Sequence, residues 1–355
     1  MSTINRSWIF MTSKAANEPA KARDRNLDFV RVLACLAVIL LHISARPIYM
    51  QDELGFWGWL LGNSVSSLTH WCVPVFVMLS AALLLGKKNT TYAHILRYRA
   101  PRMLAALAIS ILIYALWIKY FQGNFNASAF ASDIVKGVPY YHLHFFYLII
   151  GLYLIAPPLS QAVLSMGRSD LRNAIIAISL ITITSFAWST FSGTYTPNGS
   201  TFSWPYICYF LIGYYLYRYK PDLPYGKIVF AGYAVTVLGT QALAYGMGSD
   251  YAWKLYFYSY FSPTVLALAI GVWGLGLRAA ERLNFSFLKA LAPLTLLVYI
   301  THPMFMELMR YIYGKMSTTL MTPLIEIPMT FFFVTLLSFL SAYFLRKINF
   351  IRRIF

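Results

Sequence analysis

The chain has 355 residues, of which 59% are hydrophobic and 12% are charged, and its formal net charge is +17. This composition excludes an ordinary soluble globular protein, in which about a quarter of the residues are charged. The basic excess requires no nucleic acid as a partner, because basic loops at a membrane surface meet anionic lipid headgroups. Three scattered cysteines exclude a disulfide framework, and no spacing typical of a zinc site is present, so no metal is expected.

Apolar runs of about 20 residues recur along the whole chain and predict an all-α, polytopic transmembrane helical bundle. About ten spans are predicted: 27–45, 66–86, 103–121, 141–160, 173–190, 204–218, 227–247, 257–277, 290–312 and 324–345. Residues 27–345 are expected to form a single membrane domain. An N-terminal tail (1–26) precedes it and a basic C-terminal tail (346–355) follows it.

The distribution of basic residues predicts the orientation in the membrane. All but six of the 29 lysines and arginines fall on one side; the six are Arg46, Lys119, Lys136, Lys254, Arg310 and Lys315. The positive-inside rule then places both termini in the cytoplasm, with the first span as an uncleaved signal anchor. On the other side, residues 122–140 are rich in Gly, Asn and Ser and are predicted to form a polar, flexible loop.

The first span carries two side chains that an apolar helix rarely tolerates, Arg31 and His42. Eleven residues of helix bring them to within roughly 20° of one face and separate them by about 16 Å along the axis. Charged groups inside a bilayer are costly and usually serve a function. One helix face is therefore predicted to present a fixed cation near its start and a proton-accepting imidazole deeper in the membrane.

Five of the six histidines are expected at one depth, near the outer ends of their spans: His42, His70, His142, His144 and His302. Histidine moves protons near neutral pH, so this gathering favours acid–base chemistry. For His70 and His144 taken alone, an interfacial position with a solvated ring is the favoured explanation.

The ninth predicted span holds a second group of polar residues. Thr295, Tyr299 and His302 follow the spacing i, i+4, i+7 and share one helix face. Pro303 removes a backbone donor and is expected to loosen or kink the helix. Glu307 follows, and an ion pair with Arg310 at i+3 is one option for it. Helix packing is an alternative explanation for Thr295 and Tyr299.

Five sequence runs resemble the acyltransferase type 3 family of membrane-bound acyltransferases. Arg31 and His42 match its Arg-x10-His signature, and four further stretches resemble its "VPLFFxxSG", "YHLWFLY…GLYLxxP", "YFLLGYYL" and "SxxIYLIHP" runs: VPVFVMLSA (73–81), YHLHFFY with GLYLIAP (141–157), YFLIGYYL (209–216) and TLLVYITHP (295–303). Ala81, His144 and Thr295 depart from the usual Gly, Trp and Ser. The chain looks closest to the subgroup that includes the O-acetyltransferase of enterobacterial common antigen.

The resemblance implies transfer of an acyl group, usually acetyl from cytosolic acetyl-CoA but alternatively another short acyl group, to a hydroxyl of a surface polysaccharide or lipid-linked sugar. It also implies a location in the bacterial cytoplasmic (inner) membrane. The basic cytoplasmic face fits a CoA donor, since Arg holds phosphate oxygens bidentately. Arg31 and three further candidates, Arg97, Arg99 and Arg102, are predicted to bind CoA.

The predicted site combines the polar residues of the spans with the family resemblance. His42 is expected to act as the general base, or to carry the acyl group itself, with Arg31 and His302 also in the catalytic group. Tyr299 or Thr295 is expected to stabilise the oxyanion. His142, His144 and Glu307 are expected to bind the acceptor. A proton-coupled transporter or flippase of lipid-linked sugar is the alternative function, and a sensor without turnover is a third class.

Overall fold

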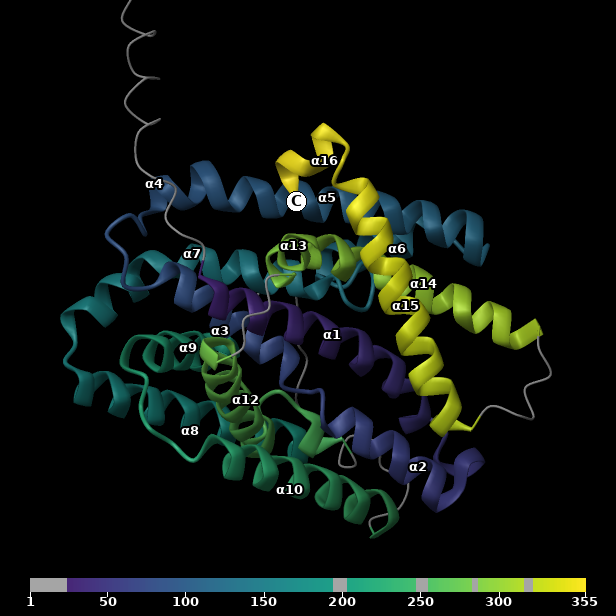
Figure 1. Ribbon diagram of the computed structural model, residues 1–355, viewed down its shortest axis with the longest axis horizontal. Helices are drawn as coiled ribbons and strands as arrows, with labels where there is room; N and C mark the ends of the chain where they lie inside the picture. Colours follow the sequence, from purple (N-terminus) through teal and green to yellow (C-terminus); the bar gives the residue numbers. More distant parts are fainter. Residues whose placement is uncertain (1–23, 194–202, 247–254, 283–286, 316–321) are drawn as a thin grey trace, which may run out of the picture.

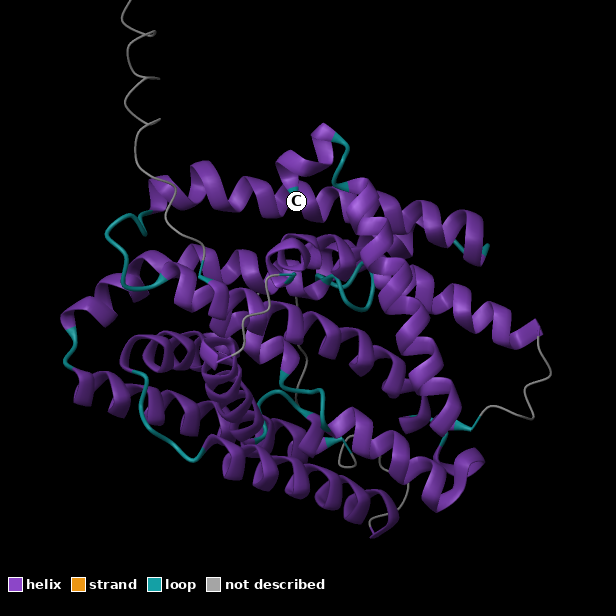
Figure 2. Cartoon of the chain, viewed as in Figure 1, coloured by secondary structure: helices purple, strands orange, loops and turns teal. Residues whose placement is uncertain are grey.

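The computed structural model describes residues 24–193, 203–246, 255–282, 287–315 and 322–355. Within these ranges the chain is mostly helical, with short loops and no strand (Figures 1 and 2). The all-α bundle expected from the apolar runs is therefore confirmed. Most of the predicted N-terminal tail, residues 1–23, lies outside the described residues.

Residues 24–193, the first of the described ranges, form eight α-helices and two short π-helices. In order they are α1 (Arg25–Ile48), α2 (Gln51–Ser67), α3 (Cys72–Leu84), α4 (Tyr92–His94), η2 (Ile95–Arg99), α5 (Ala100–Trp117), η3 (Ile118–Gln122), α6 (Ala127–Lys136), α7 (His144–Ser165) and α8 (Arg168–Ser192). The segment 122–140, predicted as a flexible loop, thus contains a helix. The Asn126 side chain caps its start, and Gly137 ends it with a φ of 81°.

The second half comprises η4 (Trp204–Tyr206), α9 (Ile207–Tyr219), α10 (Tyr225–Gly246), η5 (Tyr256–Tyr258), α12 (Pro263–Arg282), α13 (Leu288–Leu291), η6 (Ala292–Leu294), α14 (Thr295–Lys315), α15 (Pro323–Leu345) and α16 (Asn349–Ile354). α14 continues through Pro303 as one helix. The segment predicted as the C-terminal tail includes α16, which packs against α5.

Nine helical segments of the described ranges are long and apolar enough to cross a membrane, one fewer than the ten predicted spans. The difference arises at residues 204–218, which correspond to η4 and α9. α9 has 13 residues, and at ~1.5 Å per residue it is about 20 Å long, less than a ~30 Å hydrocarbon core. On which side of the membrane each terminus lies stays a prediction.

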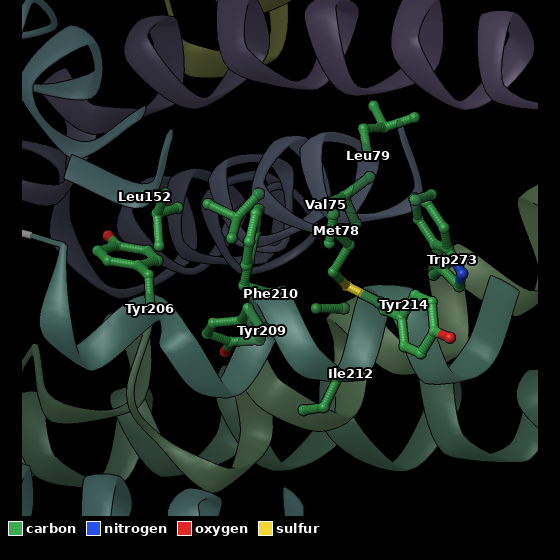
Figure 3. Packing of buried hydrophobic residues seen from close by; sticks show 14 of the residues in the cluster. Val75, Met78, Leu79, Leu152, Tyr206, Tyr209, Phe210, Ile212, Tyr214 and Trp273 are labelled. Atoms are coloured by element: carbon green, nitrogen blue, oxygen red, sulfur yellow. The ribbon is translucent and has the colours of Figure 1, made fainter. Parts of the chain in front are cut away.

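α9 is an interior helix that packs closely on α3. A Cβ atom on Gly213 would lie only 2.4 Å from the Cα atom of Met78, so glycine is what allows this approach. Buried residues from α3, α7, α9 and α12 form one core around this contact, including Phe210 and Trp273, which are both 0% exposed (Figure 3). The family-like run 209–216 is thus a packing element.

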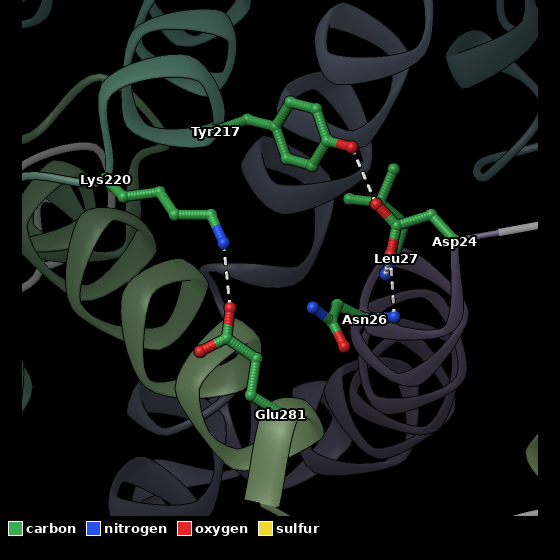
Figure 4. A network of polar contacts seen from close by, with 6 residues as sticks. All are labelled: Asp24, Asn26, Leu27, Tyr217, Lys220 and Glu281. Carbon is green, nitrogen blue, oxygen red and sulfur yellow. Dashed lines mark hydrogen bonds and ion pairs between the residues drawn. The ribbon is translucent and has the colours of Figure 1, made fainter.

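α1 lies in the centre of the bundle and packs against α2, α3, α12, α14 and α15 (Figure 1). Its start is fixed by Asp24, whose carboxylate accepts from backbone N–H groups of the first turn and from the Tyr217 hydroxyl at 2.6 Å. The end of α9 is tied to α12 by an ion pair of 2.8 Å between Lys220 and Glu281 (Figure 4). These contacts position the helix that carries Arg31 and His42.

Candidate active site

A cavity of about 300 Å³ contains both members of the pair predicted from the first span. Arg31 and His42 both line it, as their shared helix face requires. Residues of α1, α3, η2, α5, α7, η6 and α14 form its walls, and its middle is apolar: Val38, Phe76, Leu79, Leu83, Met103, Phe145 and Ile149. The cavity therefore joins a guanidinium end to an imidazole end through an apolar passage.

Two arginines from different helices form the guanidinium end, Arg31 on α1 and Arg99 on η2. The Arg31 side chain is 26% exposed and pairs with the buried carboxylate of Asp28 at 3.5 Å. Arg97 and Arg102, the other two candidates for CoA binding, are exposed and do not line the cavity. A π-helix is rare and is often found at functional sites, and here it carries the one candidate of the three that faces the cavity.

Three histidines form the imidazole end: His42, His142 and His144. The His42 ring meets the edge of Tyr141 at a centroid distance of 5.0 Å. His142 precedes α7 and is 1% exposed. His144 begins α7, and its Nδ1 atom lies 2.9 Å from the carbonyl oxygen of Tyr141.

His302 lies behind His42 rather than in the cavity wall. Its ring stacks on that of His42, with centroids 5.3 Å apart and an interplanar angle of 25°. It is 0% exposed, and its Nδ1 atom lies 3.2 Å from the carbonyl oxygen of Val298. This arrangement suits a residue that supports the His42 ring.

His70, the fifth histidine expected at this depth, occupies a different environment. Its ring stacks on Tyr258 with centroids 4.5 Å apart, and its Nδ1 atom lies 2.7 Å from the carbonyl oxygen of Ser66. It does not line the cavity. Four of the five histidines therefore come together, through helices α1 and α14 and the start of α7.

Thr295 and Tyr299 both line the cavity, as their shared face predicts. Each hydroxyl already donates to a backbone carbonyl: Thr295 to Ala292 at 2.9 Å, and Tyr299 to His142. A hydroxyl has one proton to donate. In this structure neither group has a donor left for a developing oxyanion, although one or the other was predicted to supply it.

Glu307 belongs to a separate hydrogen-bond network. Its carboxylate accepts from Trp117 at 2.7 Å, from Gln122 at 3.0 Å and from the Tyr140 hydroxyl. Glu307 is not part of the cavity wall, and the ion pairs found among the described residues do not include one with Arg310. Glu307 thus links α14 to α5 and to the turn before α7.

Sequence reasoning missed several residues that the cavity brings together. Tyr141 touches the His42 ring, while Tyr153 and Phe355 line the cavity with Arg31 and Arg99. Tyr141 could have been suspected from its place next to His142 in the sequence. Tyr153 and Phe355 could not, because they are two among many aromatic residues of the chain. Within the described ranges, no group of three His, Cys, Asp or Glu residues could hold a metal ion.

Comparison with known proteins identifies the family. The model of an acyltransferase domain, that of the type 3 family, matches residues 24–346, a range that includes every cavity residue except Phe355. Searches of curated proteins and of solved structures found no match. The family match does not distinguish subgroups, so the likeness to the subgroup named above stays a prediction. With nine apolar helices of membrane-spanning length among its described residues and this match over most of its length, the chain belongs to the type 3 family of integral membrane acyltransferases.

Proposed function

We propose that the protein is an O-acetyltransferase of the bacterial inner membrane. It takes an acetyl group from cytosolic acetyl-CoA and transfers it to a hydroxyl of a surface polysaccharide or lipid-linked sugar on the outer side. The observation that carries this proposal is the single cavity whose two ends are guanidinium groups and imidazole groups. A CoA thioester has the matching order of parts: anionic phosphates, a narrow arm and a reactive carbonyl.

The guanidinium end is the phosphate site in this proposal. Arg31 and Arg99 converge from two helices, and guanidinium groups bind phosphate oxygens through paired hydrogen bonds. The apolar middle accommodates the pantetheine arm, and the rise of about 16 Å from Arg31 to His42 is comparable to its extended length. Arg97 and Arg102 are exposed outside the cavity, and in this proposal they contact lipid headgroups.

The imidazole end is the reaction site. His42 accepts the proton of the acceptor hydroxyl as its oxygen attacks the thioester carbonyl. When the C–S bond breaks, the imidazolium returns this proton to the CoA thiolate. His302, stacked behind the ring at 5.3 Å, holds His42 in place as a positioning residue.

The test replaces His42 by Ala and measures transfer of labelled acetyl from acetyl-CoA to the glycolipid fraction of membrane vesicles. Loss of a general base lowers the rate by about 100-fold or more. The matched control is His94→Ala, because His94 lies in α4 and outside the cavity. The control is expected to keep the wild-type rate.

Two results would contradict the proposal. Transfer by correctly inserted His42→Ala at the wild-type rate would remove His42 from the reaction. Unchanged acetyl-CoA together with movement of a solute or lipid-linked sugar across the wild-type vesicles would indicate the transporter or flippase instead.

A further inference from the structure

His142 is a buried side chain with no hydrogen-bond partner in the described part of the chain. It is 1% exposed, and both ring atoms Nδ1 and Nε2 are buried and unpaired. Burying an unsatisfied polar group costs free energy. Because His142 also lines the cavity, a bound molecule is the natural source of the missing partner.

Three hydroxyl groups in the cavity wall already donate to backbone carbonyl groups and have no proton left for a substrate. Thr295 and Tyr299 already donate to carbonyl oxygens, and Ser80 donates to the carbonyl oxygen of Phe76 at 3.1 Å. Arg31 and Arg99 lie at the opposite end of the cavity. A neutral imidazole always has one N–H group, so His142 has a donor to give in either tautomer.

The His142 ring is held in place by aromatic neighbours. The edges of Tyr114 and Tyr299 meet it at centroid distances of 5.0 Å and 5.1 Å, and Tyr140 lies at 5.7 Å. The Tyr299 hydroxyl donates to the carbonyl oxygen of the same residue. A donor that is fixed before the substrate arrives needs no reorganisation during the reaction.

We propose that His142 donates its N–H group to the acyl carbonyl oxygen and stabilises the oxyanion of the tetrahedral intermediate. This inference rests on the proposed function. Attack by the acceptor oxygen forms the C–O bond, moves the carbonyl electron pair onto oxygen and sends the hydroxyl proton to His42. The oxyanion then re-forms the carbonyl, the C–S bond breaks, and the proton passes from His42 to the CoA thiolate.

Two imidazoles thus have different roles in one reaction. His302 touches both rings, with centroids 5.3 Å from His42 and 5.7 Å from His142. The two rings therefore flank the same end of the cavity, which lets one accept the proton while the other donates to the carbonyl oxygen. Tyr299 becomes a positioning residue, because its hydroxyl fixes the backbone that carries His142.

The test compares His142→Leu, which has no donor, with His142→Gln, which keeps an N–H donor but does not titrate. Removing an oxyanion donor lowers kcat by about 100- to 1000-fold. We expect this loss in the Leu variant, with the KM for acetyl-CoA nearly unchanged, and at least tenfold higher kcat in the Gln variant. Thermal unfolding of both purified variants in detergent controls for folding.

A second measurement separates the oxyanion from the acceptor. Hydrolysis of acetyl-CoA by water, without any glycolipid, passes through the same oxyanion. The proposal predicts that His142→Leu lowers hydrolysis and transfer by the same factor, whereas a residue that only binds the acceptor would affect transfer alone.

Equal kcat values for folded Leu and Gln variants, or unchanged hydrolysis in the Leu variant, would overturn the role of His142. Absence of acetyl transfer by the wild-type protein would instead overturn the proposed function. The two failures are therefore distinguishable.

Discussion

Arg31 and Arg99 show how much residue spacing can predict about this site. The 11-residue separation placed Arg31 and His42 on one face, and both line the cavity. Spacing gave no reason to prefer Arg99 over Arg97 or Arg102, because all three stand in one basic run. Arg97 and Arg99 both lie on η2, and Arg99 is the one that lines the cavity, a difference that the sequence pattern does not reveal.

The first prediction concerns these guanidinium groups. Arg31→Gln or Arg99→Gln removes a charged hydrogen-bond donor from the cavity, an interaction of about 1.5–3 kcal/mol. We expect a 10- to 100-fold rise in the KM for acetyl-CoA in each variant, measured by transfer in membrane vesicles. Arg97→Gln and Arg102→Gln are the matched controls, and we expect the KM for acetyl-CoA to change less than threefold in each. A rise as large in the controls as in the cavity variants would place the phosphates outside the cavity.

Contacts between distant segments are the part of the site that the sequence could not predict. Periodicity says which side of a helix a residue occupies, but not which helix faces it. The bond from Tyr299 to the backbone of His142 joins residues 157 positions apart. In the proposal above, this bond makes Tyr299 a positioning residue. The three bonds to Glu307 likewise link helices, while a role in binding the acceptor stays a prediction.

At the scale of the elements, α9 explains why the predicted and observed span counts differ. A hydropathy window finds the apolar run 204–218 but cannot tell a lipid-facing helix from a short helix enclosed by others. The signal for burial lay in the run YFLIGYYL itself, where Gly213 marks a close approach between helices. For the other nine predicted spans, the apolar runs were enough to predict a helix and its approximate position in the sequence.

The second prediction tests the contact between α9 and α3. Gly213→Ala places a Cβ atom 2.4 Å from Met78 Cα, where only a backbone shift can accommodate it. Overpacking of this kind costs about 1–3 kcal/mol. We therefore expect a lower melting temperature and lower yield in detergent, measured by tryptophan fluorescence on heating.

Gly226→Ala provides the matched control in α10, since a Cβ atom there meets nothing within 4 Å. Alanine is the better helix former, so this variant should melt at or slightly above the wild-type temperature. If Gly213→Ala and Gly226→Ala have the same melting temperature, the close packing of α9 on α3 is wrong.

For the whole molecule, the distribution of basic residues over the helix connections predicts one orientation in the membrane. The basic segment around Lys88 lies between α3 and α4, and α6 lies at the opposite end of the bundle (Figure 1). The positive-inside rule predicts a cytoplasmic position for Lys88 and an outer position for α6. If α9 completes a crossing, Asp222 in the α9–α10 connection is cytoplasmic as well.

The third prediction uses the fact that all three native cysteines are buried: Cys35, Cys72 and Cys208. A membrane-impermeant maleimide should therefore barely label the wild-type protein in intact cells. Single cysteines are introduced at the exposed positions Lys88, Ser132 and Asp222. We expect Ser132→Cys to react in intact cells, and Lys88→Cys and Asp222→Cys to react only after permeabilisation.

Each position tests a separate part of the orientation. If Lys88→Cys reacts in intact cells, the protein has the opposite orientation. The guanidinium end of the cavity would then face away from the cytosol and from the acetyl-CoA proposed to bind there. Reaction of Asp222→Cys in intact cells, with Lys88→Cys protected, would mean that α9 does not complete a crossing. The chain would then cross nine times, and its two termini would lie on opposite sides. If Lys88→Cys and Asp222→Cys are unlabelled in intact cells and Ser132→Cys is labelled, the orientation agrees with the proposal. Arg31 and Arg99 then lie toward the cytosolic side of the cavity, and His42 lies toward the outer side.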